Sequence, residues 1–339
     1  MLMIVCDRWD PRLGGRERYA EDLVTYLTAQ GRHVTRALTN RMEVMPGCRV
    51  LALSPVRQAT HYQLHGGPLT SALEAERESM RSALRRRLFY PSLRLNRRRS
   101  RMLREEEQLL QGSAALMTFS EGVRRELVTK YGVSPSRLVL SRPGVDLRRF
   151  APSDERDLER GKEPVRLAFV GHNFALKGLR AAILALAHGR SSGVDAVLTI
   201  AGRGATAPYR RLASALGVAH HVAFAGALSQ HDVARLYRAS DMLVHPTFYD
   251  PFPRVVIEAL ASGCPVITTE RCGAAEIMTT REGIVIRNPH DAGALADAIR
   301  TVIDRTKRGG MRAAAAALGR QFDDAGHFRA TADWLFRQA

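Results

Sequence analysis

The chain has 339 residues, of which 45% are hydrophobic and 25% are charged, which suits two globular domains with separate cores. No run reaches the roughly 20 apolar residues of a membrane-spanning helix and no signal-peptide pattern opens the chain, so we expect a cytoplasmic protein. The formal net charge of +17 predicts an anionic partner: a nucleotide, a phospholipid surface or a phosphorylated glycan. The four cysteines form no close metal-ligand pairs and are expected as buried, reduced thiols.

Residues 1–40 have the pattern of a strand, a glycine loop, a helix and a second strand. Gly14 and Gly15 stand in the loop before the predicted helix at Tyr19–Ala29. Glycine there lets backbone N–H groups approach a phosphate closely, although a plain turn would use the same residues. Further on, His65 precedes two glycines and is equally consistent with a functional and a structural histidine.

A long helical segment of unusual charge is predicted between Glu74 and Glu107. It contains Arg85–Arg87 and Arg97–Arg99 around aromatic and aliphatic residues, and Pro91 should break or kink it. Arginines interleaved with apolar side chains suit a surface of anionic lipid. A solvated basic helix face and a nucleic-acid surface are the alternatives, but no known nucleic-acid-binding module accompanies the segment.

The composition divides the chain near residue 152. A strand-like Ala114–Phe119, a helix and a short strand complete the first part, and the polar stretch from Ser153 to Pro164 is typical of a linker. We therefore predict an N-terminal domain at residues 1–152, shortened between residues 40 and 64, and a C-terminal domain at residues 163–318.

The second domain begins with the buried-strand pattern of Val165–Val170, followed by a turn that contains Lys177. A lysine at such a turn can place a compact charge on a pyrophosphate, and a surface lysine is the alternative. The alternation of strands and helices that follows predicts a parallel sheet, whose ligands gather beyond the carboxyl ends of the strands.

The stretch from Ser240 to Ile267 contains the strongest functional signal. It is predicted as a strand, a proline-rich loop, a helix at Arg254–Ala261 and another strand. Asp250 precedes this helix and Glu258 lies inside it, so both carboxylates could accept hydrogen bonds from one ligand at the helix N-terminus. A helix cap and a solvated acidic residue would give the same spacing.

Several of these segments resemble the motifs of family 4 glycosyltransferases. Residues 250–259, DPFPRVVIEA, are similar to the signature E-P-F-G-L-V-x-x-E-A, with Asp250 in the place of the first Glu. Residues 14–18, GGRER, resemble G-G-x-E-R, and residues 171–178 resemble G-R-x-x-x-x-K-G with His172 in place of the Arg. The resemblance implies the GT-B fold: an α/β protein of two Rossmann-like parallel-sheet domains facing a central cleft. It implies that residues 1–152 form the acceptor-side domain, with the C-terminal helix, about 322–339, packed on it, and that residues 163–318 form the nucleotide-sugar-binding domain.

The resemblance also implies a function. It predicts a retaining transfer of a hexosyl group from a UDP-, GDP- or ADP-sugar to a hydroxyl of a lipopolysaccharide-core or other lipid-linked glycan. It further implies peripheral attachment to the inner face of the cytoplasmic membrane through residues 85–99, with no nucleic acid expected. A sugar-nucleotide epimerase of the same architecture and a non-catalytic basic lipid- or nucleic-acid-binding protein are the alternatives.

Site residues follow residue by residue from the matched motifs. In these motifs Lys177 would neutralise the departing diphosphate and Asp250 would orient the sugar. His65 lies outside them and is a candidate for a group near the acceptor hydroxyl because it precedes two glycines. No D-x-D triplet is present, so we expect neither a metal nor a cofactor. The expected donor-binding residues are Gly14, Gly15, Gly171, His172, Lys177, Gly202, Leu228, Asp250, Phe252, Pro253, Arg254, Val255 and Glu258.

Overall fold

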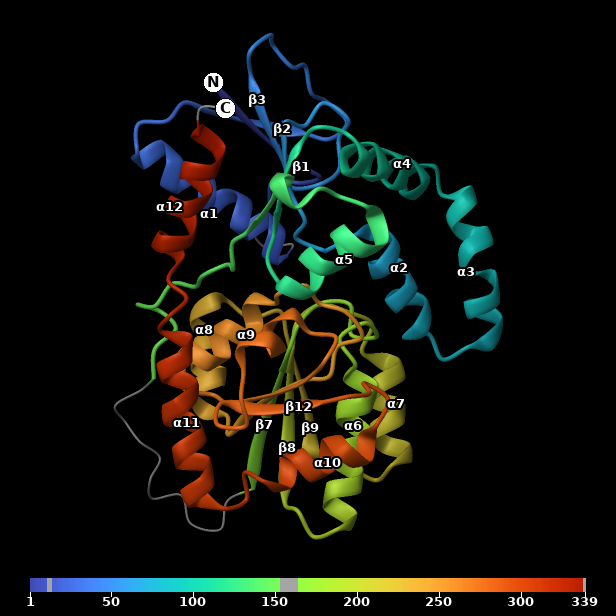
Figure 1. The fold of residues 1–339 in the computed structure, drawn as a ribbon. Coiled ribbons are helices and arrows are strands. Elements are labelled where there is room, and N and C mark those ends of the chain that lie inside the picture. Colours follow the sequence, from blue (N-terminus) through green and yellow to red (C-terminus); the bar gives the residue numbers. More distant parts are fainter. Residues whose placement is uncertain (11–13, 153–163, 338–339) are drawn as a thin grey trace. The chain divides into compact units, whose positions relative to one another are not determined.

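The computed structural model describes residues 1–10, 14–152 and 164–337, and the predicted linker therefore lies mostly outside the described residues (Figure 1). The chain divides into two compact units. Unit 1 comprises Met1–Pro143 and Asp324–Ala339, and unit 2 comprises Gly144–Asp323. The division falls at Pro143, before the linker that the composition indicated.

Unit 1 contains a six-stranded parallel sheet in the order β2-β1-β3-β4-β5-β6. Its strands are β1 (Leu2–Cys6), β2 (Val34–Leu38), β3 (Arg49–Ala52), β4 (His61–Gln63), β5 (Ala115–Thr118) and β6 (Leu138–Leu140). Every residue of β1 is buried, as expected for an inner strand covered on both faces. The chain runs from β1 to β2 on one side and then returns to β3 on the other, so the strand order reverses at β1.

Helices flank this sheet. They are α1 (Gly15–Ala29), α2 (Leu69–Glu78), α3 (Ala83–Leu95), α4 (Arg97–Gln111), α5 (Glu121–Tyr131) and α12 (Asp324–Phe336). A 3-10 turn spans Pro135–Arg137. The last helix lies beside α1, where the Tyr19 hydroxyl and Nε2 of His327 are 2.9 Å apart (Figure 1). This buried hydrogen bond links residues more than 300 positions apart in the sequence.

The basic segment differs from its prediction as one long helix broken or kinked at Pro91. The structure places Pro91 inside α3 and starts a new helix after Asn96. Phe89 and Leu93, buried one turn apart, hold α3 in place on both sides of the proline. Asn96 caps α4 by accepting a hydrogen bond from the amide of Arg99 at 3.1 Å, which stabilises the new helix start.

Unit 2 contains a second six-stranded parallel sheet, in the order β12-β11-β10-β7-β8-β9. Its strands are β7 (Val165–Val170), β8 (Ala196–Ala201), β9 (Val222–Gly226), β10 (Met242–His245), β11 (Val266–Thr269) and β12 (Gly283–Ile286). Its helices are α6 (Leu179–Ser191), α7 (Ala207–Ala215), α8 (Gln230–Ala239), α9 (Arg254–Ala261), α10 (Ala292–Arg300) and α11 (Arg305–Gly319). Short 3-10 turns span Ala219–His221 and Gly273–Ile277.

The strand order of unit 2 reverses at β7. The chain runs from β7 through β8 to β9 on one side, and β10 then pairs with the other side of β7. Ligands of parallel sheets bind beyond the carboxyl ends of the strands at such a reversal. The loops that follow β7 and β10 are therefore the part of unit 2 where a site is expected.

All four cysteines are buried and unpaired to one another, as predicted. None of the helices in the described part of the chain is long and apolar enough to cross a membrane.

Candidate active site

The loop after β7 and the loop after β10 are pressed together at Gly178. This glycine has φ +77°, and a Cβ atom there would lie 2.1 Å from the carbonyl oxygen of Pro246. Only glycine permits this combination of a left-handed backbone and a close approach. The amide of Phe248 also donates to the carbonyl of Leu176 at 2.9 Å, so the two loops are fixed to each other on both sides of Lys177.

This fixed contact brings two of the predicted site residues together. The ammonium of Lys177 lies 2.5 Å from Oδ2 of Asp250, and both side chains are largely shielded from solvent. Nε2 of His245, the last residue of β10, lies 3.3 Å from the same oxygen. The other carboxylate oxygen, Oδ1, makes no hydrogen bond within the described ranges of the chain, which leaves it for a ligand.

The charge on Asp250 is set by these neighbours. Burial alone would raise the pKa of Asp250, but the Lys177 ammonium and the hydrogen bond from His245 outweigh it and hold the pKa below its usual value. Burial lowers the pKa of His245, and Asp250 offsets this only in part. The site at neutral pH therefore consists of an ammonium, a carboxylate and a neutral imidazole.

The Asp250 carboxylate fixes the direction of its hydrogen bond with His245. Because the Asp250 carboxylate can only accept, Nε2 of His245 carries the proton and donates it. Nδ1 then has a lone pair, and it is buried without a hydrogen-bond partner in the part of the chain that the structure describes. The sequence analysis did not propose His245 as a site residue, because His245 ends a run of apolar strand residues. The available signal was that it directly precedes a proline at the end of a strand.

The loop after β11 joins the same edge. The amide of Asp250 donates to the carbonyl of Arg271 at 3.2 Å, and the amide of Gly273 donates to the carbonyl of Asp250 at 2.7 Å. The segment Gly273–Ile277 then forms a 3-10 turn. Asp250 is thus held by backbone as well as side-chain bonds, with little freedom to move.

Glu258 lies on α9 and is 8% exposed, so the alternative of a solvated acidic residue is wrong. Its charge is close enough to Tyr237 to raise the pKa of that phenol, together with the larger effect of burial. The other alternative, Asp250 as a helix cap, is also wrong, because Pro253 occupies the N-cap of α9 and no side chain caps it. Among the described residues the α9 N-terminus thus has no side-chain cap.

The remaining predicted residues of this loop differ in whether the side chain or the backbone is expected to act. Phe252 is buried and packs on Phe322 with ring centroids 6.1 Å apart, so its ring anchors the loop. Pro253 is also buried, and Arg254 and Val255 form the first turn of α9. Their predicted contribution through loop amides remains a prediction.

The glycine loops after β7 and β8 approach each other closely. Gly202 has φ +136°, and a Cβ atom there would lie 1.8 Å from the carbonyl oxygen of Gly171. The amide of Arg203 donates to Nδ1 of His172 at 3.0 Å, so this nitrogen is not available to donate to a diphosphate. Leu228 follows β9, two strands away from β7, and is partly exposed.

The other predicted residues belong to unit 1. Gly14 is the N-cap of α1 with an extended backbone, and Gly15 is its first residue. His65 follows β4 with its ring centroid 4.5 Å from Tyr19 and 4.7 Å from Phe119. Its Nε2 lies 3.3 Å from Oε1 of Gln63. These contacts are those of a packed histidine, and its role near an acceptor remains a prediction.

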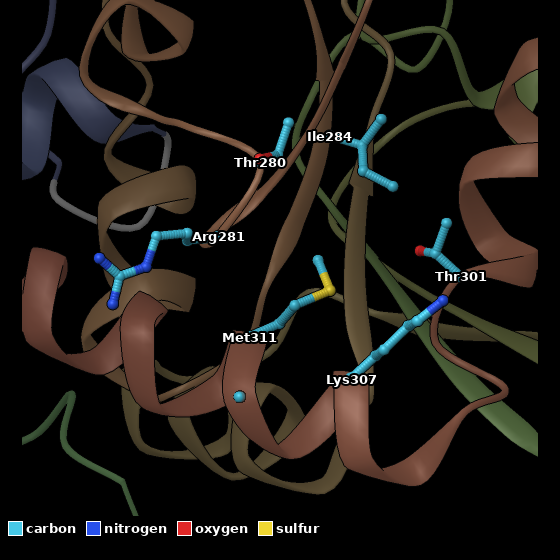
Figure 2. A pocket seen from close by; sticks show the side chains of 7 residues that line it. Thr280, Arg281, Ile284, Thr301, Lys307 and Met311 are labelled. Carbon is cyan, nitrogen blue, oxygen red and sulfur yellow. The ribbon is translucent and has the colours of Figure 1, made fainter.

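A cavity of about 570 Å³ in unit 2 lies apart from the predicted residues (Figure 2). It is formed by β12, the loop before it and α11, and it contains none of the residues predicted for the site. The described residues contain no group of three or more His, Cys, Asp and Glu side chains arranged to hold a metal ion.

Two six-stranded parallel sheets with flanking helices are the architecture of the GT-B glycosyltransferases. The structure of WaaG, a glycosyltransferase involved in lipopolysaccharide biosynthesis, matches with a TM-score of 0.81 and 20% identity over 100% of both chains. HepE of Anabaena, solved in complex with UDP and glucose, matches with a TM-score of 0.72 and 17% identity over 99% of both chains.

The sequence places the chain in one family of this class. The chain belongs to the family Glycosyl transferases group 1, because the model of that family matches residues 151–320. It is 33% identical over 218 residues to the D-inositol 3-phosphate glycosyltransferase 2 of Catenulispora acidiphila. That match covers 60% of this chain and 51% of the relative, so the chain spans about half the length of the curated relatives it matches.

Proposed function

We propose that this protein is a retaining glycosyltransferase that moves a hexosyl group from a UDP-, GDP- or ADP-sugar to a hydroxyl of a lipid-linked glycan. A lipopolysaccharide-core glycan is the first acceptor to test. The proposal depends chiefly on the Lys177–Asp250 pair, which lies where the strand order of unit 2 reverses. The complex of HepE with UDP and glucose supports a nucleotide-sugar as the donor class.

The site offers the groups that this transfer needs. The bond between C1 of the sugar and the diphosphate breaks, and a bond from C1 to the acceptor oxygen forms on the same face of the sugar. The hydroxyl proton passes to the oxygen of the departing diphosphate. The Lys177 ammonium would bind the diphosphate as its charge grows, which favours the transition state over the bound donor. Oδ1 of Asp250 would accept a hydrogen bond from a sugar hydroxyl and so orient the ring.

His245 gives this arrangement a second function. When Lys177 turns toward a diphosphate, the Asp250 carboxylate keeps the hydrogen bond from Nε2 of His245 at 3.3 Å. The buried charge is then not left without a donor, which would cost several kcal/mol in an enclosed site. His245 is therefore proposed as a positioning residue for Asp250.

The acceptor class is supported by the surface of α3. Leu84, Leu88 and Leu95 lie along one stripe of this helix and are 65%, 52% and 85% exposed. Arg85–Arg87 are exposed on the same helix, while Phe89 and Leu93 face the protein. An apolar stripe bordered by arginines suits the headgroup region of an anionic bilayer, where a lipid-linked acceptor would be met.

A panel of labelled nucleotide-sugars tests the reaction. A donor that binds the folded protein should raise its melting temperature, and the same donor should release nucleoside diphosphate when an acceptor is present. Return of an intact, isomerised nucleotide-sugar would instead identify an epimerase. If no member of the panel shifts the melting temperature or is consumed, the proposed function is wrong.

Vesicle co-sedimentation tests the membrane surface separately. Replacing Arg85, Arg86 and Arg87 by Gln should weaken binding to phosphatidylserine-containing vesicles about 100-fold, because each arginine contributes about 1 kcal/mol near an anionic surface. Replacing three exposed arginines of unit 2, Arg211, Arg281 and Arg287, removes the same charge and should have little effect. Equal losses in the two variants would show that only net charge matters.

A further inference from the structure

The cavity of unit 2 lies at the opposite end of the sheet from the Lys177–Asp250 pair. Thr280 and Arg281 of its lining directly precede β12, so the cavity is at the amino end of that strand. All strands of this sheet are parallel, and the loops that hold Lys177 and Asp250 follow the carboxyl ends of β7 and β10. A molecule bound in this cavity is therefore not positioned to react at the pair.

The middle of the cavity is apolar. Met311 of α11 extends toward β12, which contributes Ile284, and Thr280 and Thr301 complete this part of the lining (Figure 2). Met311 is 9% exposed, so the floor of the cavity is well shielded from solvent. The volume of about 570 Å³ lies within the roughly 300 to 1,000 Å³ of sites that enclose small molecules.

A glycine of α11 helps to keep this cavity open. Lys307, Gly310 and Met311 are spaced three and one positions apart and therefore share one face of the helix. A Cβ atom at Gly310 would have no neighbour within 4 Å. Glycine inside a helix is less favourable than any residue except proline. The helix thus contains an unfavourable residue at the position where a larger side chain would fill the cavity.

Positive charge accompanies the apolar lining. The cavity is lined by Arg281 and Lys307 and by no acidic residue. Neither cation forms an ion pair within the part of the chain that the structure describes. Of the carboxylates nearby in sequence, Glu282 accepts hydrogen bonds from Thr279, and Asp304 accepts them from the first amides of α11. An apolar cavity with an unpaired cation suits a ligand that joins an apolar body to a carboxylate or phosphate.

The two cations differ in direction. Lys307 extends from α11 toward Thr301, whereas Arg281 extends away from Met311 (Figure 2). Lysine is a compact charge on a flexible stem, and Lys307 shares the helix face of Gly310 and Met311. Lys307 is therefore the cation placed to hold the anionic group of a ligand whose apolar part lies against Met311.

We propose that this cavity is a second binding site, for a free single-chain amphiphile with a carboxylate or phosphate head group. The chain lies against Ile284 and Met311, and the head group binds the Lys307 ammonium. At roughly 30 Å³ per heavy atom, the volume of a water molecule in the liquid, a 10-carbon chain with its head group fills about 350 to 450 Å³. A phospholipid with two such chains would need about 1,000 Å³ and does not fit. The inference goes beyond the proposed function and does not depend on it.

Four ligands test the chemistry of the site. Decanoate and decyl phosphate should bind at least about 10-fold more tightly than decanol, because one charge-assisted hydrogen bond to lysine accounts for that factor. Butyrate lacks six methylene groups and should bind at least about 100-fold more weakly than decanoate. Titration calorimetry at concentrations below aggregation measures the four affinities. The comparison of decanoate with decyl phosphate distinguishes a fatty acid from a single-chain phospholipid as the source of the ligand.

Variants of α11 place the binding in the cavity. Gly310→Leu fills the cavity with a side chain that also favours the helix, so decanoate binding should fall at least about 30-fold while the melting temperature is kept. Gly309→Leu is the matched control, because Gly309 also has open space around it but does not line the cavity. Lys307→Gln should weaken decanoate binding about 10-fold. Arg281→Gln removes the same charge from a side chain that points away and should change binding less than about 3-fold.

The outcomes decide the inference. Equal affinities for decanol and decanoate, or equal affinities of Gly310→Leu and Gly309→Leu for decanoate, would overturn it. Gly310→Leu should also bind phosphatidylserine-containing vesicles like the unaltered protein. A loss of vesicle binding would show that the cavity takes a lipid from a bilayer, which contradicts a free amphiphile. Nucleotide-sugar binding is measured separately, so the failure of either proposal leaves the other standing.

Discussion

Units 1 and 2 each contain a six-stranded parallel sheet whose strand order reverses at an inner strand. The two units differ in the partners that surround a carboxylate shielded from solvent. In unit 2 the largely shielded Asp250 contacts the Lys177 ammonium, and the pKa of Asp250 is lowered. In unit 1 the buried Glu106 of α4 accepts hydrogen bonds from two neutral donors, the Tyr62 hydroxyl at 2.8 Å and the Leu69 amide at 2.6 Å. Burial raises the pKa of Glu106 to about 7.

The difference shows what each carboxylate can do. An ion pair keeps Asp250 charged, as its proposed role in orienting a sugar requires. Glu106 lies beside neutral donors, so it holds a proton up to near-neutral pH and acts as a structural link between α4, β4 and the start of α2. The two carboxylates therefore differ in charge at neutral pH because one has a cation beside it and the other has only neutral donors.

Removing the cation of unit 2 should have the largest effect. Lys177→Met is expected to lower kcat about 100- to 1000-fold, because it deletes the charge that would stabilise the departing diphosphate. Steady-state kinetics with the best donor of the panel measures this loss. Lys130→Met, which removes an exposed lysine of unit 1 that also pairs with a carboxylate, is the matched control and should retain full turnover.

Separating the two loops of unit 2 should rank second. Gly178→Ala places a Cβ atom against the Pro246 carbonyl in a left-handed backbone, and we expect a loss of roughly 3 to 4 kcal/mol in the free energy of unfolding. Gly193 has φ +84° with open space around it, so Gly193→Ala should cost only the backbone strain, about 1 kcal/mol. Urea denaturation measures the free energy of unfolding of both variants. Equal losses would show that the close approach of Gly178 to the Pro246 carbonyl does not affect stability.

The carboxylate of unit 1 should give the smallest effect, visible only as pH dependence. Between about pH 4.5 and 7, Glu106 is ionised in the unfolded chain but protonated in the folded one, so the folded state binds more protons and stability falls as pH rises. The expected loss across this range is about 2 to 3 kcal/mol. Glu106→Gln should remove that part of the slope in unfolding curves recorded from pH 4 to 8.

A flat wild-type profile, or an identical slope in Glu106→Gln, would contradict the raised pKa. The variant keeps two hydrogen-bonding atoms of similar shape, so it can still accept from the Leu69 amide while donating to Tyr62. Asp250 provides the opposite expectation in the same experiment. Its lowered pKa adds stability above its unfolded pKa, and this stability is lost only as the pH falls through the folded value.

Some of the fold could be read directly from the sequence because single elements carry their own signal. The mostly apolar runs Val165–Val170 and Met242–His245 form strands with those bounds, since strands covered on both faces are predominantly apolar. The helix Arg254–Ala261 also has its predicted bounds, because a glycine and a proline follow it closely.

The basic segment shows where such reading fails. Proline is unfavourable inside a helix, yet α3 continues through Pro91 because its buried face packs on both sides of it. The helix boundary at Asn96 depends on a side-chain cap that the sequence offers at many other positions as well. Helix propensity predicted the helical segment, but tertiary packing determined where the helices end.

By itself, the sequence predicted most of the alternating strands and helices and proposed Lys177, Asp250 and Glu258 as site residues, because local motifs and apolar periodicity depend on neighbouring residues. It predicted neither β4 nor β12, which are short strands with weak local patterns. Only the tertiary structure joined Lys177 to Asp250, added His245 to them, and formed a cavity between β12 and α11. Strand order decides which loops meet at the edge of a sheet. That order is set by long-range packing that no short stretch of sequence contains.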